Sequence, residues 1–192
     1  MNGNRGIDPD AQRPDSKDNV ALIGMPGAGK STVGILLAKA LGAPFVDTDV
    51  LIQTNEGRRL QELLDALGAE GFCAREARHI LALQCRGTVI ATGGSVVYSD
   101  DAMRHLAAHG CIVYLEVPPE ILKNRLSDFS SRGVVIPRGT GIETLYAERR
   151  SRYTRWADYT VNAAAPHDTV VRRILACLCP KRVEGPTPGC LE

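Results

Sequence analysis

The residues from Gly24 to Ser31, GMPGAGKS, satisfy the pattern GxxxxGK[ST] at every fixed position and follow a short apolar run. Glycines in such a loop let backbone N–H groups converge on phosphate oxygens, and the N-terminus of the next helix adds its dipole. Lys30 would reach the β- and γ-phosphates, and the hydroxyl of Ser31 would coordinate Mg²⁺. The motif therefore predicts binding of a nucleoside triphosphate, but it does not specify the reaction.

The rest of the sequence narrows the reaction class. An NKxD sequence, with which Ras-type GTPases read the base, does not occur. A chain of 192 residues is also short for a large ATPase motor. We therefore expect a small phosphotransferase.

Two carboxylates follow the second apolar run, at Asp47 and Asp49 in the sequence FVDTD. In an open parallel sheet, ligands bind outside the carboxyl ends of the strands. If the strand continues through both residues, its period of two places both side chains on one side. A kinase needs carboxylates to hold Mg²⁺ and to position or deprotonate the acceptor hydroxyl, and these two are the candidates. By itself, a DxD sequence is also typical of a solvated loop or a helix cap.

The third apolar run ends in ATGGS, which places Gly93 and Gly94 at the same edge. Adjacent glycines allow the backbone to approach a ligand closely, and they equally suit a tight turn into a helix. Arginines are frequent in the second half of the chain, and a phosphoryl-transfer site has a use for only two or three of them. The arginines considered are Arg125, Arg132, Arg138, Arg149, Arg150, Arg152 and Arg155.

The elements that would position these residues alternate in type along the chain. Short apolar runs predict five strands, and stretches with helical spacing predict seven helices between and after them. Such alternation is typical of an α/β fold with a parallel sheet and helices on both faces. The expected strands are 20–23, 45–46, 88–91, 111–117 and 159–161, and the expected helices are 30–41, 59–67, 71–83, 100–109, 119–126, 142–157 and 167–178.

The length favours one domain. Residues 1–18 are polar and rich in Gly, Asn, Asp and Pro, and residues 180–192 are polar and rich in Pro and Gly, so we interpret them as disordered tails around a single kinase domain at 19–179. The segment 127–141, rich in Ser, Gly and Arg, is a candidate mobile lid, and a plain surface connection would have the same composition.

Composition excludes several other classes. A formal net charge of +1 and only three Phe, one Trp and five Tyr give little support to a nucleic-acid-binding protein. No run of about 18 apolar residues and no signal-peptide h-region occur, so we expect a cytoplasmic protein that is not bound to a membrane. The six cysteines and four histidines lack metal-ligand spacing, which makes a zinc site a poor interpretation.

Taken together, these motifs resemble the shikimate kinase family. The resemblance rests on GMPGAGKST, FVDTD, Gly71–Phe72 with Arg75–Glu76, ATGGS, YLEVP and LYAERRSRY, in the family's order from about residue 20 to 178. It implies a nucleoside-monophosphate-kinase-like fold with a five-stranded parallel sheet and a mobile lid. It also implies transfer of the γ-phosphoryl of ATP to the 3-hydroxyl of shikimate, a step of aromatic amino acid biosynthesis, by a monomer.

The same resemblance assigns roles to individual residues. Asp49 would bind the acceptor hydroxyls and act as the base, with Lys30 and Arg132 stabilising the transferring phosphoryl. Ser31 and Asp47 would lie at the metal. The residues implied for ATP are Gly27, Ala28, Gly29, Lys30, Ser31, Thr32, Arg125 and Arg132, and those implied for the acceptor are Asp49, Gly93, Gly94 and Arg149.

Two positions depart from the family's pattern. Where the family commonly has Phe-Arg, with the arginine on the substrate carboxylate, this chain has Phe72-Cys73. A thiol cannot replace a guanidinium, and Arg75, two positions on, is expected to face elsewhere unless the helix shifts in register. The family also has three consecutive glycines where this chain has Gly93, Gly94 and then Ser95. Two alternatives therefore stay open, namely a kinase of the same fold with another small hydroxylated acceptor and an ATP-binding regulatory protein without turnover.

Overall fold

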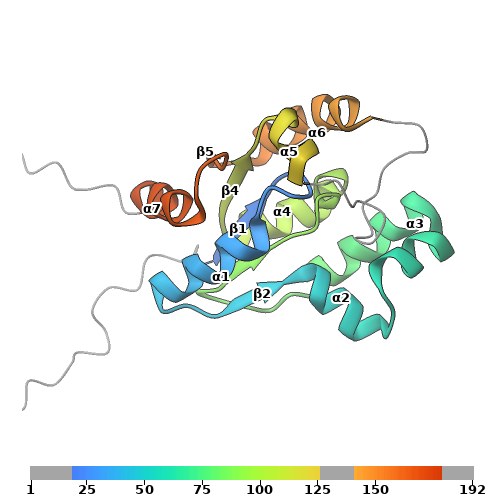
Figure 1. Cartoon of the computed structure of the whole chain (residues 1–192). Helices are drawn as coiled ribbons and strands as arrows, with labels where there is room; N and C mark the ends of the chain where they lie inside the picture. Colours follow the sequence, from blue (N-terminus) through green and yellow to red (C-terminus); the bar gives the residue numbers. More distant parts are fainter. Residues whose placement is uncertain (1–18, 126–140, 179–192) are drawn as a thin grey trace, which may run out of the picture.

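The computed structural model describes residues 19–125 and 141–178, and within them five parallel strands form one sheet in the order β2-β3-β1-β4-β5 (Figure 1). The strands are β1 (Asn19–Ile23), β2 (Phe45–Asp47), β3 (Val89–Ala91), β4 (Gly110–Glu116) and β5 (Tyr159–Asn162). From β1 the chain crosses to β2 and β3 on one side and then to β4 and β5 on the other. The order reverses beside β1, which is where an open parallel sheet forms its ligand crevice.

The central strands β1 and β4 are continuously apolar apart from Asn19 at the start of β1 and Glu116 at the end of β4, because helices cover both faces of the sheet. Val20 of β1 is in register with Val89 of β3 and Cys111 of β4. Leu22 and Ile23 are completely buried. The hydrophobic core therefore lies around β1 and β4 and fixes the position at which the loop after β1 leaves the sheet.

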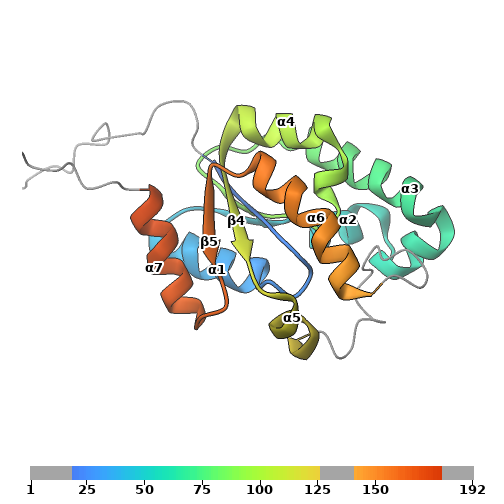
Figure 2. The same ribbon diagram turned by 90° about the horizontal axis from the view of Figure 1, so that it is seen from above.

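Figure 2 shows α1 and α7 on one side of the sheet and α4 on the other. The second half of α3 packs beside α4, and α6 packs against β4 and α5. The helices are α1 (Lys30–Leu41), α2 (Thr48–Glu56), α3 (Leu60–Leu81), α4 (Asp100–His109), α5 (Pro119–Arg125), α6 (Ile142–Trp156) and α7 (His167–Leu178), with a short 3₁₀ turn η1 (Val96–Tyr98) before α4.

The predicted fold class and the five strands are confirmed, and the expected helices 30–41, 100–109 and 167–178 match in their bounds. The two helices expected at 59–67 and 71–83 are both present and follow one another within α3, where they meet at a kink. The kink lies at Gly68, whose φ of 69° and ψ of 177° are not helical. Glycine tolerates this conformation because it lacks a β-carbon.

The sequence interpretation missed α2. The placement of Asp47 and Asp49 on one side was conditional on the strand continuing through both residues, but the chain turns into a helix at Thr48. The Asp47 side chain causes the change, because its Oδ1 accepts hydrogen bonds from the backbone N–H groups of Asp49 and Val50 and so caps the helix. Asp49 therefore stands in the first turn of a helix, and the argument from strand periodicity does not apply to it.

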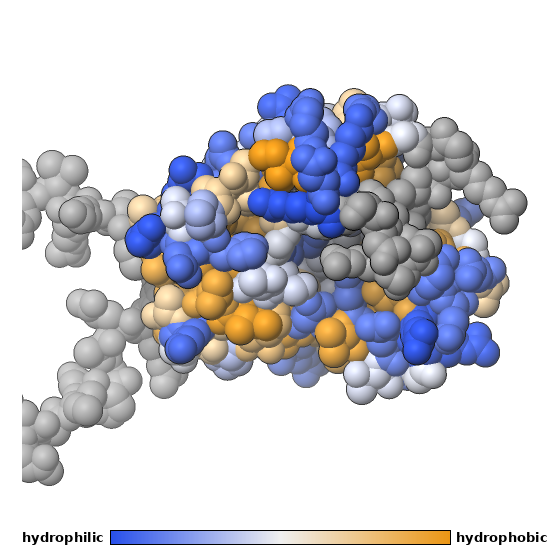
Figure 3. All heavy atoms as spheres, in the orientation of Figure 1, coloured by the Kyte–Doolittle hydropathy of each residue, from blue (hydrophilic) through white to orange (hydrophobic). Residues whose placement is uncertain are grey.

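Several predictions fall outside the described residues. The expected tails at 1–18 and 180–192 and Arg132 lie there, and so does the expected lid at 127–141 apart from Gly141, which precedes α6. Over 19–125 and 141–178 no helix has the length and apolar character needed to cross a membrane. On the face shown in Figure 3, apolar residues are interrupted by polar ones and form no broad patch.

Candidate active site

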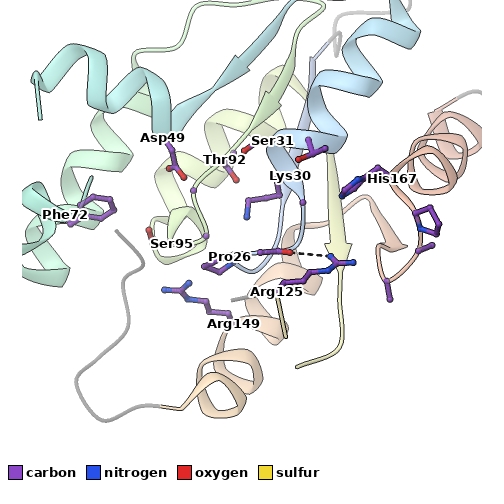
Figure 4. A pocket seen from close by; sticks show the side chains of 18 residues that line it. Pro26, Lys30, Ser31, Asp49, Phe72, Thr92, Ser95, Arg125, Arg149 and His167 are labelled. Carbon is purple, nitrogen blue, oxygen red and sulfur yellow. Dashed lines mark hydrogen bonds between the residues drawn. The ribbon is translucent and has the colours of Figure 1, made fainter. Parts of the chain in front are cut away.

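A cavity of about 680 Å³ lies at the carboxyl ends of β1 and β3. Figure 4 shows Lys30 near its middle, with Asp49, Phe72, Ser95 and Arg149 toward one end and Arg125 and His167 toward the other. The first group comes from α2, α3, the turn after β3 and α6, and the second comes from α5 and α7. The fold thus brings residues from six separate segments to the single sheet edge that the sequence predicted.

The loop from Gly24 to Ser31 has the backbone of a phosphate-binding loop. Gly24, Gly27 and Gly29 all have positive φ. At Gly24 a β-carbon would lie 2.7 Å from the carbonyl oxygen of Leu115, so β4 leaves room only for glycine. Gly29 ends the loop directly before α1, whose first-turn N–H groups are thereby directed into the cavity. The residues present fit a nucleotide phosphate chain.

Lys30 is buried at the start of α1. Its Nζ donates hydrogen bonds to the carbonyl oxygens of Gly24 and Met25 over 2.8 and 3.0 Å. Burial lowers the pKa of the ammonium to about 8, against the opposing influence of the Asp49 carboxylate. The loop carbonyl oxygens carry only partial negative charge, so a bound phosphate would compensate the charge of the Lys30 ammonium more completely.

Asp49 faces Lys30 across the cavity (Figure 4). Burial raises the pKa of its carboxyl to about 6, and the positive charge of Lys30 opposes this shift. Thr48, the residue before it, accepts a hydrogen bond from the backbone N–H of Gly93. This contact fixes the start of α2 beside the turn after β3. A half-buried carboxylate with a raised pKa is suited to accept a proton from a hydroxyl.

Asp47 has a different position from Asp49. Its Oδ1 caps α2, and it does not line the cavity. Ser31 does line the cavity. No group of three or more His, Cys, Asp and Glu side chains that could hold a metal ion occurs within 19–125 and 141–178. Mg²⁺ keeps several waters and binds substrate phosphates with one or two protein ligands, so a site at Ser31 fits that ion, and the role of Asp47 near it stays a prediction.

Gly93 and Gly94 line the cavity and leave no room for side chains. A β-carbon on Gly93 would lie 2.0 Å from Glu76 Oε1 and 2.9 Å from Asp49 Oδ1. A β-carbon on Gly94 would lie 2.9 Å from the ring of Pro26 in the phosphate loop. Of the two interpretations of this pair, the turn is confirmed, because Gly94 and Ser95 form a turn that leads into η1. Close approach to a ligand stays a prediction.

Arg149 of α6 also reaches the cavity, although only 1% of its surface is exposed. Its Nε donates a hydrogen bond to the hydroxyl of Tyr98 over 3.0 Å, and its guanidinium carbon lies 5.0 Å from the centre of that ring. These contacts orient the planar cation beside Ser95 and Gly94. A guanidinium in this position suits a carboxylate on the acceptor.

Arg75 does not replace the arginine that is missing at Cys73. Its Nη1 is paired with Glu56 of α2, which also accepts a hydrogen bond from His79 over 2.8 Å. The side chain therefore ties α2 to α3 and does not line the cavity. This agrees with the expectation that it faces elsewhere, and no shift in helix register occurs.

Arg125 lies at the opposite end of the cavity. It donates hydrogen bonds to the carbonyl oxygens of Gly27 and Ala163 over 3.3 and 3.4 Å and thereby bridges the phosphate loop and the segment after β5. His167, the exposed first residue of α7, lines the same end next to Gly29 and was not among the predicted site residues. Its position after the last strand was the available signal, because that strand also ends at the functional edge.

The buried carboxyl of Glu76 was likewise not among the predicted site residues. Burial and the nearby Asp49 raise its pKa to about 7, while a hydrogen bond with Ser95 and the charges of Arg149 and Lys30 oppose the shift. It lies behind Gly93 and Ser95, outside the cavity lining. From the sequence, the indications were its place in the Arg75–Glu76 motif and its spacing of four from Phe72 on one helix face.

Comparison with known proteins is consistent with this geometry. The family model for shikimate kinase matches residues 26–179. "Shikimate kinase 2" of Enterobacter sp. is 35% identical over 165 residues, which cover 83% of this chain and 94% of that protein. Solved structures of shikimate kinases also match, among them those from Acinetobacter baumannii and Aquifex aeolicus.

The first solved structure is a shikimate kinase from Acinetobacter baumannii in complex with shikimate. It has a TM-score of 0.81 and 27% identity, with coverage of 88% of this chain and 97% of that one. The second, a shikimate kinase from Aquifex aeolicus, has a TM-score of 0.74 and 31% identity, with coverage of 87% and 99%. With the phosphate loop, the acceptor-side carboxylate and these matches together, the chain belongs to the shikimate kinase family.

Proposed function

We propose that this protein transfers the γ-phosphoryl group of ATP to the 3-hydroxyl of shikimate. The observation that carries the proposal is the placement of Lys30, Asp49 and Arg149 around one cavity, with a phosphate loop at one end and a carboxylate and a guanidinium at the other. Family membership gives the donor and the acceptor. The cavity has room for both substrates, since small-molecule sites range from about 300 to 1,000 Å³.

In this mechanism the chain positions the two reactants and stabilises charge. The loop from Gly27 to Thr32 holds the nucleotide phosphates, and Arg125 contacts the nucleotide side of the loop. Arg149 binds the acceptor carboxylate, and Gly93 and Gly94 let the ring approach closely. Asp49 accepts the proton of the attacking hydroxyl, while Lys30 stabilises the negative charge on the transferring group.

The metal-binding part of the proposal rests on Ser31, with Asp47 nearby, and bound Mg²⁺ would neutralise charge on the phosphate oxygens. Arg132, outside the described residues, is proposed to add positive charge at the transferring phosphoryl. We further propose that residues 19–179 act as a monomeric, cytoplasmic kinase domain with a lid at 127–141. Closure of that lid would exclude water and limit ATP hydrolysis without an acceptor.

A kinase for another small hydroxylated acid is the second candidate. It is favoured by the described acceptor end of the cavity, where Arg149 is present but the nearby side chain on α3 is the half-buried thiol of Cys73. Arg75 does not compensate, because it is paired with Glu56. An ATP-binding regulatory protein without turnover has no such observation in its favour.

A coupled ADP-release assay with ATP and Mg²⁺, with and without shikimate, tests the proposal. Strong stimulation by shikimate is the expected result. Intact ATP binding without stimulation would move the search to other hydroxylated acids, which the same assay can screen. Failure of every acceptor, with ATP still bound, would favour the regulatory interpretation.

A further inference from the structure

Ser95 and Glu76 form a hydrogen-bonded pair at the acceptor end of the cavity. Ser95 Oγ and Glu76 Oε2 are 2.6 Å apart, a separation typical of a hydroxyl that donates to a carboxylate. Only Ser95 lines the cavity, whereas Glu76 lies behind it with 1% of its surface exposed. A ligand therefore contacts the hydroxyl, and the carboxyl acts through it.

The second carboxyl oxygen of Glu76, Oε1, lies in a closely packed position beside Gly93. Oε1 is buried and has no hydrogen-bond partner among the described residues. It faces Gly93, whose hypothetical β-carbon would lie 2.0 Å from it and 2.9 Å from Asp49 Oδ1, so the two carboxyls are within about 5 Å of each other. Among the described residues, the Ser95 hydroxyl is thus the hydrogen-bond partner that holds the Glu76 carboxyl in place.

The proton count of this pair limits what Ser95 can offer to a ligand. A serine hydroxyl has one proton and two lone pairs. When Glu76 is ionised, that proton is committed to Oε2, so Oγ can only accept hydrogen bonds, from the ligand and from the neighbouring Cys73 thiol. When Glu76 is protonated, it can donate to Oγ, and the serine proton becomes free to point into the cavity.

We propose that Ser95 and Glu76 together recognise a hydroxyl group of the acceptor. The lone pairs of Ser95 Oγ accept a hydrogen bond from that hydroxyl at this side of the cavity, while the acceptor carboxylate binds Arg149. This inference rests on the proposed function, since it assigns a contact within the same acceptor site. Ser95 is the contact residue and Glu76 is a positioning residue. A ketone or carboxylate oxygen at the same point would face lone pairs and bind weakly.

The pair depends on pH because Glu76 titrates near neutrality. Burial and the charge of Asp49 raise its pKa to about 7, and the Ser95 hydrogen bond lowers it in part. Above this pH the carboxylate forms and rejection of a ketone strengthens, whereas below it Ser95 can donate and rejection weakens. The titratable or charged groups around Glu76 are Asp49 of α2, Lys30 of α1, Cys73 on its own helix, and Arg149 and Tyr153 of α6.

The test compares shikimate with two analogues, each with one non-reacting hydroxyl oxidised to a ketone. We measure the Kd of each ligand by calorimetry without nucleotide and divide the Kd of the ketone by the Kd of shikimate. Any effect of a variant on the carboxylate, which all the ligands share, cancels in this ratio. For one of the two analogues, the wild-type ratio of Kd values at pH 8 should be about ten or more. That ketone no longer has the proton that the hydroxyl donates to Ser95 Oγ, so its oxygen faces the lone pairs of Oγ without a hydrogen bond. The ratio should fall several-fold at pH 6.

Two variants separate recognition from structure. Ser95→Ala should bring the ratio close to one at both pH values. Glu76→Gln should lower it at pH 8 and remove its pH dependence, because the amide can donate to Ser95 at any pH. Glu62→Gln, on an exposed part of α3 where glutamine keeps the capping interaction, is the control and should behave as wild type. Equal ratios in wild type, Ser95→Ala and Glu76→Gln would overturn the proposal.

A second measurement does not depend on the acceptor. The carboxyl carbon of Glu76, observed by NMR and assigned by its loss in Glu76→Gln, should titrate at higher pH in Ser95→Ala than in wild type, because the hydrogen bond to the carboxylate is gone. An unchanged midpoint would refute the pair whatever the acceptor is. If shikimate is phosphorylated but the Kd ratios are equal in wild type and variants, the proposed function stands and the proposal for Ser95 and Glu76 fails. If shikimate is not phosphorylated, the proposed function fails, and the NMR titration alone tests the interaction between Ser95 and Glu76.

Discussion

The hydroxyl of Tyr153 donates a hydrogen bond to the carbonyl oxygen of Gly94 over 2.7 Å, and this contact ties α6 to the turn after β3. Tyr153 is completely buried and its ring stacks on Tyr114 of β4, with ring centres 5.0 Å apart. One turn earlier, α6 carries Arg149 into the cavity. The cation and the glycine turn, which both line the cavity, are therefore held by the same helix.

Tyr153→Phe should loosen this connection without opening a cavity. The Gly94 carbonyl would lose its partner, and we expect the free energy of unfolding to fall by about 1 to 3 kcal/mol in urea titrations. The KM for the acceptor should rise more than the KM for ATP, since the phosphate loop is not in this contact. Tyr159→Phe, at an exposed position on β5, is the control. An equal rise in both KM values would show that α6 does not act on the acceptor end alone.

Lys30→Ala should abolish phosphoryl transfer. The substitution removes the buried cation whose Nζ lies beside the phosphate loop, and loss of one such group costs about 10² to 10³ in turnover or more. ADP release measured with saturating ATP and acceptor gives the effect. Lys39→Ala, on the exposed last turn of the same helix, should keep wild-type turnover. Wild-type activity in Lys30→Ala would refute the phosphate-loop mechanism.

Asp49→Asn should separate ATP binding from turnover. The amide has nearly the shape of the carboxylate but cannot accept the proton of the acceptor hydroxyl, so kcat should fall by about 10² to 10⁴. The Kd for ATP, measured by calorimetry, should stay within about threefold of wild type, because one charge near Lys30 is lost. Asp65→Asn on exposed α3 is the matched control. A parallel loss of ATP binding would place Asp49 on the nucleotide side of the reaction.

The phosphate loop and the sheet could be predicted because each follows from local sequence. The loop is a contiguous motif. The strands β1 and β4 are nearly continuous apolar runs, which is the pattern of a strand covered by helices on both faces of the sheet. The helix at Thr48–Glu56 could not be found from hydrophobic pattern, because it begins through a side-chain cap at Asp47. The contact between Ser95 and Glu76 joins residues 19 positions apart and depends on how α3 packs on the turn after β3, which periodicity does not specify.

Arg149→Ala should weaken binding of a carboxylated acceptor. The guanidinium is held by Tyr98 with its fork toward the cavity, so its removal should raise the acceptor KM by about 10- to 100-fold and change the ATP KM little. Arg150→Ala removes the next arginine on α6, which is exposed and paired with Glu116, and should leave both KM values unchanged. Because Arg149 is buried, a thermal melt of each variant must show a folded protein. An unchanged acceptor KM in folded Arg149→Ala would contradict the proposed carboxylate contact.

Arg75→Ala tests whether the second arginine near the acceptor site is structural. Its hydrogen bond, followed by that of His79, lowers the pKa of Glu56 to about 2. A depressed carboxyl pKa gives stability that is present above pH 4.5 and is lost as pH falls toward 2. Urea midpoints should therefore be lower in Arg75→Ala than in wild type at pH 7, and the difference should shrink at pH 3. The acceptor KM should stay within about twofold, as in the exposed control Arg58→Ala, whereas a rise like that of Arg149→Ala would mean that Arg75 reaches the substrate.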